Sequence, residues 1–383
     1  MKKISILLIS LVFFSCGAQD LQQSDNPNQD TQENIPHNIT FKNLFDARNT
    51  EGVECYRIPA LVTAPNGDLI AAIDERVPGC ADLRGSKDIN IVQRRSADNG
   101  KTWTEIETVI DFPYGQSASD PSMIVDDETG DIFMFYNYMD LEKEKDVYYL
   151  HVIKSTDNGK TWGEPKDITS QISKEEWHND FKFITSGRGI QTQNGRLLHT
   201  LVRLKEGVYL FGSDDHGENW FLIDSPVKPA DESKVIQLAN GNYMINSRVN
   251  TGEGHRYVHV SEDKGLTWET FAEHELVDPG NNASIIRYTS VNEGDDKNRL
   301  LFSNSNNAEG RKNLTVRISY DEGKTWSSGK TVYSGPAAYS SMTILENGHI
   351  GIFFEKDNYT ENAFVSFPLS WLTDGEDSLK GTD

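Results

Sequence analysis

Short apolar runs separated by two-residue turn signals recur along the whole chain. A turn pair followed by an apolar strand is the pattern of a β-hairpin. The pairs are Asn66-Gly67, Thr129-Gly130, Asn194-Gly195, Asn240-Gly241 and Asn347-Gly348, with Asp296-Lys297-Asn298 as a looser version. The pattern therefore predicts six hairpins.

A second pattern, Ser-x-Asp-x-Gly-x-Thr-Trp, recurs five times, and we call each copy a box. The boxes start at Ser96, Ser155, Ser213, Ser261 and Ser319 and end at Trp103, Trp162, Trp220, Trp268 and Trp326. The third is degenerate, with Asn219 in place of Thr. Such an Asp can accept hydrogen bonds from the amides after it, and Gly supplies a positive φ. The Trp can bury its ring between strands. We interpret the box aspartates as structural.

Every hairpin except the last is followed by a box, which gives six units of two hairpins each. Residues 38–372 number 335, or about 56 per unit. Repeats of this length predict an all-β fold, a six-bladed β-propeller of four-stranded antiparallel blades. The repeat leaves no room for a second domain. The alternative is a long parallel β-helix, whose coils are much shorter and do not need paired hairpin turns.

Composition narrows the functions that the chain can have. The formal charge is −22, from 37 basic and 59 acidic residues. A protein this acidic is not expected to bind nucleic acid through counterion release, so we predict no nucleic-acid partner. Its mean field also repels anions. Any anion site must therefore be a local cluster of arginines.

The N-terminus has the features of an export signal. Lys2 and Lys3 precede an apolar segment, residues 4–14, that is too short to span a bilayer. Ser15-Cys16-Gly17 is similar to a bacterial lipoprotein cleavage site with Cys16 as the lipidated residue. We expect a signal peptide at 1–16, a polar tether at 17–37, the propeller at 38–372 and a polar tail at 373–383. The protein is then lipid-anchored at the cell envelope; ordinary secretion is the alternative.

Two cysteines remain in the mature chain, Cys55 and Cys80. In an oxidising compartment they could form a disulfide, and two buried free thiols would look the same in sequence.

Strand geometry predicts where polar residues gather. About ten residues before the hairpin turns stand Arg57, Asp120, Glu232 and Tyr339; about seven after them stand Asp74, Arg76, Arg248 and Glu355. At about 3.3 Å per residue, these positions share the end opposite the turns. Arg311, eight residues before Ser319, reaches the same end, whereas the boxes occupy the other. Three arginines that converge from three blades are expected to bind one anion together. The alternative is that each forms a separate salt bridge on a solvated rim.

The motif Tyr56-Arg57-Ile58-Pro59-Ala60-Leu61, together with the five boxes, resembles the bacterial sialidases (neuraminidases) of glycoside hydrolase family 33. The resemblance covers about residues 38 to 372. It implies that Arg57, Arg248 and Arg311 form a carboxylate-binding triad.

The resemblance also implies roles for the acidic and tyrosine residues. Tyr339 matches the nucleophile, Glu232 its partner base, and Asp82 in the loop Pro78-Gly79-Cys80-Ala81-Asp82 the acid/base, with Asp74 and Asp88 as nearby alternatives. Glu355 matches the residue that orients Arg57. Arg76 and Asp120 match secondary positions of the substrate pocket.

These residues together imply an exo-α-sialidase that acts on sialylated glycans by a retaining mechanism, because sialidases use a tyrosine where most retaining glycosidases use a carboxylate. We expect no metal or organic cofactor, a monomer, and membrane contact only through the N-terminal lipid. The rivals are a transglycosylating sialidase and a non-catalytic glycan-binding propeller, although a pure binder would need only the arginines.

Overall fold

A computed structural model describes residues 38–379 of the chain. The signal peptide, the lipidated Cys16, the tether and the last four residues of the predicted tail lie outside the described residues. Within residues 38–379, no helix combines the length and the apolar character that a membrane crossing needs. Two short α-helices occur in this range, α1 (Thr169–Ile172) and α2 (Leu369–Leu372).

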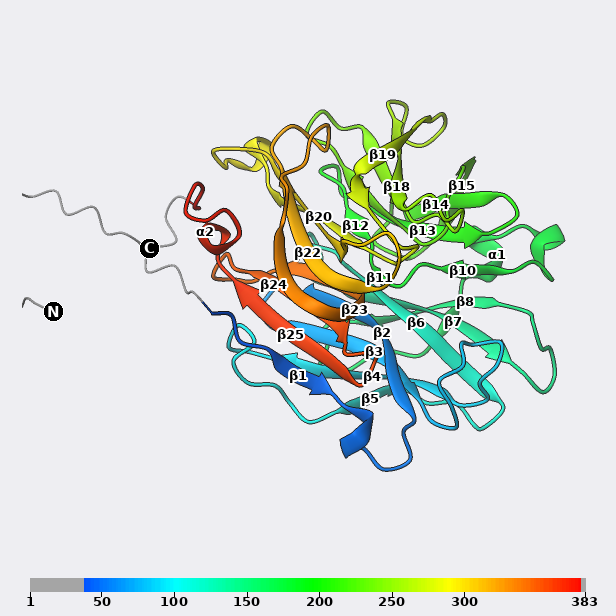
Figure 1. The fold of residues 1–383 in the computed structure, drawn as a ribbon. Helices are drawn as coiled ribbons and strands as arrows, with labels where there is room; N and C mark the ends of the chain where they lie inside the picture. The colour runs from blue at the N-terminus through cyan, green and yellow to red at the C-terminus, as the bar shows by residue number, and fades with distance from the viewer. Residues whose placement is uncertain (1–37, 380–383) are drawn as a thin grey trace, which may run out of the picture. The chain divides into compact units, whose positions relative to one another are not determined.

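The described residues form an all-β arrangement of small sheets around a common centre (Figure 1). The first sheet contains β2 (Cys55–Thr63), β3 (Leu69–Arg76), β4 (Ile89–Ser96) and β5 (Glu107–Ile110). The second contains β6 (Gln116–Val125), β7 (Ile132–Asp140), β8 (Tyr149–Ser155) and β9 (Lys166–Asp167), with β11 (Gly187–Arg188) parallel to β6. The third contains β10 (Lys182–Ile184), β12 (Ile190–Gln191), β13 (Leu197–Arg203), β14 (Gly207–Ser213) and β15 (Phe221–Val227). The fourth contains β16 (Ser233–Gln237), β17 (Tyr243–Ser247), β18 (His255–Ser261) and β19 (Glu269–Val277).

The fifth sheet has seven strands. They are β1 (Lys42–Phe45), β20 (Ser284–Thr289), β21 (Arg299–Ser305), β22 (Lys312–Ser319), β23 (Lys330–Ile344), β24 (Ile350–Lys356) and β25 (Glu361–Phe367). The chain is closed into a ring here, because β1 pairs with the last strand, β25.

The propeller-like arrangement predicted from the repeats is confirmed, but the strands form five sheets where six separate four-stranded blades were expected. The reason is the length of β23. Its first half, Lys330 to Pro336, pairs with β22, and its second half, Ala337 to Ile344, pairs with β24. A single continuous strand thus joins what the repeat counts as the fifth and sixth units into one sheet.

The apolar core is divided into clusters that lie between neighbouring sheets. One cluster joins Val62 of the first sheet to Met134 of the second, and another joins Leu210 of the third to Ile245 of the fourth. A further cluster joins Phe353 of the seven-stranded sheet to Ile73 of the first. Burial of such side chains is the main favourable contribution to folding.

The boxes are the turns that follow β4, β8, β14, β18 and β22, as predicted. In the second box Asp157 accepts hydrogen bonds from the amide and hydroxyl of Thr161, at 2.9 and 2.7 Å. In the degenerate third box the side chain of Asn219 donates to Asp215 at 2.8 Å, so it replaces the threonine hydroxyl. In all five boxes the aspartate therefore accepts hydrogen bonds from residues of its own turn.

Each box also presses its glycine against the preceding sheet. A Cβ at Gly159 would lie 2.3 Å from Ile70 of the first sheet, and one at Gly100 would lie 2.2 Å from Phe364 of the last. Both glycines have a positive φ, of 74° and 81°. Glycine is needed for the backbone conformation and for the close approach. The boxes therefore fasten neighbouring sheets together at one end of the molecule.

The C-terminal segment that was expected to be a polar tail contacts the sheets. Asp377 accepts hydrogen bonds from Arg299 at 2.7 Å, Lys297 at 3.0 Å and Tyr320 at 2.9 Å. Burial acts to raise the pKa of Asp377, but the two cations and the phenol together outweigh it and lower this pKa below its usual value. Contact with the fold thus continues beyond Leu372.

Candidate active site

Three inner strands carry a β-bulge at the end opposite the boxes. Register shifts lie at Arg57–Ala60 in β2, Ser119–Ser122 in β6 and Ala337–Ser340 in β23. Bulges often re-aim a side chain beside a functional site. Here they fall at Arg57, Asp120 and Tyr339, three of the residues predicted from the sequence.

The first two bulges place non-glycine residues at positive φ. Ile58 has a φ of 68° and Asp120 a φ of 64°. This conformation is unfavourable, above all for a β-branched residue such as isoleucine. At Ile58 it is held by the amide, which donates to Glu355 Oε1 at 2.9 Å. Pro59 and Pro121 follow directly, and a proline inside a strand is tolerated at such a bulge.

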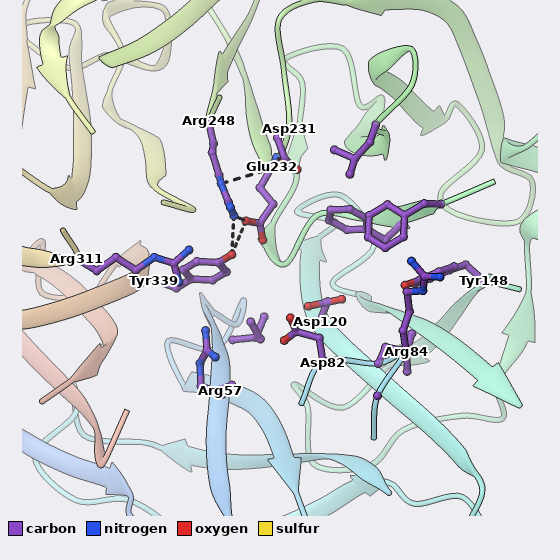
Figure 2. A pocket seen from close by; sticks show the side chains of 16 residues that line it. Arg57, Asp82, Arg84, Asp120, Tyr148, Asp231, Glu232, Arg248, Arg311 and Tyr339 are labelled. Carbon is purple, nitrogen blue, oxygen red and sulfur yellow. Dashed lines mark hydrogen bonds and ion pairs between the residues drawn. The ribbon is translucent and has the colours of Figure 1, made fainter. Parts of the chain in front are cut away.

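A cavity of about 480 Å³ opens at this end, a size suited to a small ligand (Figure 2). Seven of the nine residues predicted for catalysis and substrate binding line it: Arg57, Asp82, Asp120, Glu232, Arg248, Arg311 and Tyr339. The other two, Arg76 and Glu355, are buried behind the lining and hold residues that face the cavity. Of the three aspartates considered for the acid/base, Asp82 lines the cavity, whereas Asp74 is fully buried and Asp88 lies outside the lining.

Tyr339 and Glu232 are joined by a hydrogen bond within the cavity. The tyrosine hydroxyl donates to Glu232 Oε2, and Arg248 Nη1 donates to the same carboxylate oxygen and, at 2.8 Å, to the tyrosine oxygen (Figure 2). Tyr339 is buried, with 7% of its surface exposed. Burial, followed by the charge of Glu232, raises the pKa of Tyr339 well above its usual value, although Arg248 and Arg311 act against this. Tyr339 is therefore a phenol with a carboxylate in position to take its proton.

The three predicted arginines converge on Tyr339. Besides the contact from Arg248, Cζ of Arg311 lies 5.1 Å and Cζ of Arg57 lies 5.9 Å from the centre of the Tyr339 ring. Arg57 lies in β2 of the first sheet, Arg248 directly follows β17 of the fourth, and Arg311 directly precedes β22 of the fifth. Their side chains surround one ring, which separate salt bridges on a rim would not do.

Glu355 fixes Arg57. Its Oε1 accepts from Arg57 Nε at 2.7 Å, and its Oε2 accepts from the Tyr339 amide at 3.0 Å. The Glu355 side chain has no exposed surface. Burial disfavours the charge of Arg57, but Glu355 outweighs this and raises the pKa of Arg57. One carboxylate thus ties the first arginine to the backbone of the tyrosine.

Asp82 lies across the cavity from Glu232 on a loop with two anchors (Figure 2). The Cys55–Cys80 disulfide, which the sequence left open, joins the loop to β2. Arg76 Nη1 donates to Asp82 Oδ1 at 2.7 Å and to the carbonyl of Cys80 at 3.0 Å. The Asp82 side chain is 85% exposed. Some desolvation acts to raise the pKa of Asp82, but the charge of Arg76, supported by Arg57 and Arg311, lowers it overall.

Asp74, which is buried, and Asp120, which is partly buried and lines the cavity, form an acidic pair next to Arg76. Asp74 accepts from Arg76 Nη2 at 3.0 Å, from the Ser119 hydroxyl at 2.9 Å and from the Asp120 amide at 2.9 Å. Burial raises the pKa of Asp74 to about 6, against the opposing charge of Arg76. Burial and then the charge of Asp74 raise the pKa of Asp120 well above its usual value. Asp120 therefore carries less negative charge than its neighbour Asp82.

Sequence reasoning missed several residues of this site. Tyr359 stacks on the Arg57 guanidinium, whose Cζ lies 3.9 Å from the ring centre, and its hydroxyl accepts from Arg311 at 3.4 Å. Its only signal is that it follows Glu355 at the same end of β24. The apolar side of the cavity, formed by Tyr148, Phe181, Phe183 and Leu204, was also missed. Phe181 and Phe183 belong to an insertion that does not repeat, so no pattern marks them. Asp231, beside Glu232, is a further lining residue that was missed.

Among residues 38–379, no group of three or more His, Cys, Asp or Glu side chains is arranged to hold a metal ion.

Comparison with known proteins places this site in a family. Residues 67–352 match the model of the BNR repeat-like domain. A sialidase of Micromonospora viridifaciens is 36% identical over 352 residues, which are 84% of this chain and 53% of that protein. A sialidase of Bacteroides fragilis is 31% identical over 333 residues, 78% of this chain and 60% of that protein. This chain therefore spans about half to three-fifths of the length of these curated relatives.

A solved structure agrees with these relatives. The structure of a Hadza microbial sialidase superposes with a TM-score of 0.75 at 28% identity, over 84% of this chain and 67% of that one. The match of the domain model covers well over half of the 383 residues. The chain thus belongs to the BNR-repeat family that contains these bacterial sialidases.

Proposed function

We propose that the protein is an exo-α-sialidase that removes terminal α-linked sialic acid from glycans and retains the anomeric configuration. The observation that carries the proposal is the hydroxyl of Tyr339, hydrogen-bonded to Glu232 and surrounded by Arg57, Arg248 and Arg311. A site built only to bind glycans would need the arginines but not a tyrosine with a base at its hydroxyl. The two relatives reported above are named sialidases, which supports the same function.

The arginines suit the carboxylate that a sialic acid carries on its anomeric carbon. Arginine binds carboxylates through paired N–H donors in a fixed plane. The chain has a formal charge of −22, which repels anions on average. Three arginines close to one ring make this site locally positive. We infer that they hold the substrate carboxylate above Tyr339 and fix the sugar for attack.

Tyr339 then acts as the nucleophile. A carboxylate in this place would repel the substrate carboxylate, whereas a phenol is neutral until it reacts. The raised pKa of Tyr339 means that it cannot ionise alone at neutral pH. Glu232 therefore takes the proton as the phenolic oxygen bonds to the anomeric carbon, in the manner of a nucleophile activated by an adjacent base.

Asp82 acts on the leaving group. As the glycosidic bond breaks, it gives a proton to the leaving oxygen, and it later takes a proton from the water that releases the sugar. In the free protein Arg76 lowers the pKa of Asp82, so the carboxyl must gain its proton when substrate binds. Binding supplies two reasons for this gain, because it covers an exposed side chain and neutralises the charges of Arg57 and Arg311.

We also propose that the seven-stranded sheet accounts for the predicted number of six blades. We infer that the two halves of the seven-stranded sheet act as separate units joined through β23. In support, one apolar cluster packs Leu301 and Val316 of one half against Ile352 and Val365 of the other, just as clusters pack between separate sheets. The bulge at Ala337–Ser340, where β23 changes partner, would then set the direction of Tyr339.

The test is hydrolysis of an aryl α-sialoside by the wild type and by Tyr339→Phe. We expect turnover to fall about 10³-fold, because the variant lacks the nucleophilic oxygen. Nuclear magnetic resonance of the first-formed product should show the α-anomer. Tyr333→Phe, a change on the same strand outside the cavity, is the matched control and should keep wild-type turnover.

Undiminished turnover in Tyr339→Phe, or an inverted first product, would contradict the mechanism. Transfer of the sugar to an added acceptor, or formation of an internal anhydro sugar, would instead favour the transglycosylating alternative. Binding of sialosides without any turnover by the wild type would favour the non-catalytic alternative.

A further inference from the structure

A buried lysine lies one strand step below the proposed base. Lys234 stands two residues after Glu232, at the start of β16, with 3% of its surface exposed. The backbone at Glu232 is extended, because its carbonyl accepts from the amide of Arg248 and continues the ladder between β16 and β17. Side chains two residues apart on a strand share a face and lie about 7 Å apart along it. Lys234 is therefore on the same side of the strand as Glu232, deeper in the molecule.

The end of the Lys234 side chain packs closely against the backbone of Gly187. A Cβ at Gly187 would lie 3.2 Å from Cε and 3.7 Å from Nζ of Lys234, and 3.9 Å from the hydroxyl of Ser341. Ser341 follows Tyr339 by two residues on β23. Strands of the second, fourth and fifth sheets thus meet around the ammonium group, directly below the nucleophile and its base.

Lys234 has a hydrogen bond but no ion pair. Its Nζ donates to Asn282 Oδ1 at 2.6 Å, and Asn282 in turn donates to the Ser186 hydroxyl at 2.8 Å. Within residues 38–379 no carboxylate is paired with it. Burial lowers the pKa of Lys234 to about 7, and Glu232 is the negative group that acts against this shift. Glu232, which also binds Arg248, is therefore the anion that faces this buried lysine.

Other charged groups around the pair are either compensated or neutral. Arg256 on β18 donates to Asp278 at 3.2 Å and to the carbonyl of Asn281 at 2.6 Å. Burial, assisted by the charge of Lys234, lowers the pKa of His199 on β13 to about 3, so this imidazole is neutral. Glu232 itself faces Arg248, Tyr339, Asp120, Asp231 and Arg256 as well as Lys234.

We propose that Lys234 is a positioning residue of the nucleophile, whose buried ammonium keeps the Glu232 carboxylate ionised and so able to take the proton of Tyr339. This inference rests on the proposed function. Arg248 binds the Glu232 carboxylate from the cavity side, and Lys234 adds a second positive charge on the buried side. Lys234 touches neither substrate nor Tyr339, and it acts through Glu232 alone.

The first experiment compares the pH dependence of kcat/KM in the wild type, Lys234→Met and Lys182→Met. In Lys234→Met the acidic midpoint should move up by about one pH unit, because Glu232 then keeps Arg248 on the cavity side but loses the positive charge on its buried side. Lys182 is the matched control, a lysine as deeply buried whose Nζ donates to the carbonyls of Trp177 and His178, and its variant should keep the wild-type profile. Lys234→Arg should restore the profile. An acidic midpoint unchanged in Lys234→Met would overturn the proposal.

A second measurement covers the case in which Lys234→Met does not fold or the wild type does not hydrolyse sialosides. The carboxyl carbon of Glu232 in the wild type, assigned by its loss in Glu232→Gln, is followed by nuclear magnetic resonance as pH changes. Besides the inflection from its own titration, we expect the chemical shift of this carbon to show a second inflection near pH 7, where Lys234 loses its proton. Its absence overturns the proposal. Its presence in a protein that does not cleave sialosides would leave the charge coupling in place and reject the proposed function.

Discussion

The two ends of the molecule use aspartate in opposite ways. At the box end, the carboxylate of Asp157 is held by the amide and hydroxyl of Thr161, four residues away, and these bonds lower the pKa of Asp157 to about 2. At the cavity end, burial raises the pKa of Asp74 to about 6; Arg76 binds it from the same strand, whereas Ser119 and the Asp120 amide bind it from a strand of the second sheet. A carboxylate at the box end is satisfied by its own turn. The carboxylate of Asp74 at the cavity end gains its remaining hydrogen bonds only when the first two sheets have assembled.

The same contrast holds for the other contacts of the cavity. Tyr339 and Glu232 are 107 residues apart in sequence, and Arg57 and Glu355 are 298 apart. Substitutions at the two ends should therefore separate, with stability lost at the box end and activity lost at the cavity end. The largest tests of this contrast are changes at the cavity.

Arg311→Met should have the largest effect, a fall in kcat/KM of about 10²–10³-fold. Removing one donor of the proposed carboxylate site weakens both substrate and transition state. The free energy of unfolding should hardly change, because the hydrogen bonds of Arg311 to Tyr359 and to the Gly280 carbonyl are long, at 3.4 and 3.3 Å. Steady-state kinetics and urea unfolding measure the two quantities. A large loss of stability with unchanged kinetics would contradict the expectation that substitutions at the cavity end reduce activity and leave stability unchanged.

The Cys55→Ser/Cys80→Ser double variant should affect both quantities, because the disulfide connects a strand of the ring to the loop of Asp82. Closing a loop with a separation of 25 residues stabilises a fold by about 3 kcal/mol. We also expect kcat to fall, since Asp82 keeps only its bond to Arg76. Denaturant unfolding and kinetics on the oxidised wild type and the variant test this. Full activity in the variant would show that the remaining anchor suffices.

Asp321→Ala, at the fifth box, should lower stability by about 1–2 kcal/mol while kcat and KM stay at wild-type values. The variant loses the bonds from the amide and hydroxyl of Thr325, at 2.9 and 2.7 Å, and loosens a turn packed on Met244 of the fourth sheet. Thermal unfolding and kinetics at saturating substrate give the two readings. Kinetic damage without a stability change would remove the division between the ends.

The smallest effect is in the pH dependence of stability. As pH falls, the aspartate at the cavity end should raise the free energy of unfolding, and the aspartate at the box end should lower it. Asp74 has a pKa of about 6 against an ordinary 3.8, so the native state binds the extra proton and gains stability as pH falls through 6. Asp157 has a pKa of about 2, so its contribution is present above 3.8 and is lost as pH falls toward 2. Urea unfolding from pH 7 to 3 of the wild type, Asp74→Asn and Asp157→Asn isolates each slope. Equal signs would contradict the comparison.

The structure differs from the sequence prediction where the extent of a strand or the position of a side chain depends on contacts with residues distant in the chain. The hairpin turns fixed the strand ends, but whether β23 would be one strand or two depended on its neighbours β22 and β24. The family resemblance gave Arg76 a secondary position in the pocket, and its guanidinium lies behind Asp82, where Asp74 compensates its charge. Tyr359 was missed because the turn Asp357-Asn358-Tyr359 has no feature beyond that of a turn.

The sequence by itself determined the local part of this protein. Turn pairs, boxes and apolar alternation act within about ten residues, so they set the hairpins, the end that the boxes occupy and the end at which Arg57, Arg248 and Arg311 must lie. Only the tertiary structure decided which side chains meet: the hydroxyl of Tyr339 with Glu232, Glu355 with Arg57, and Lys234 below the base. Burial sets the charge of these groups, and burial is complete only when sheets from distant parts of the chain have closed around them.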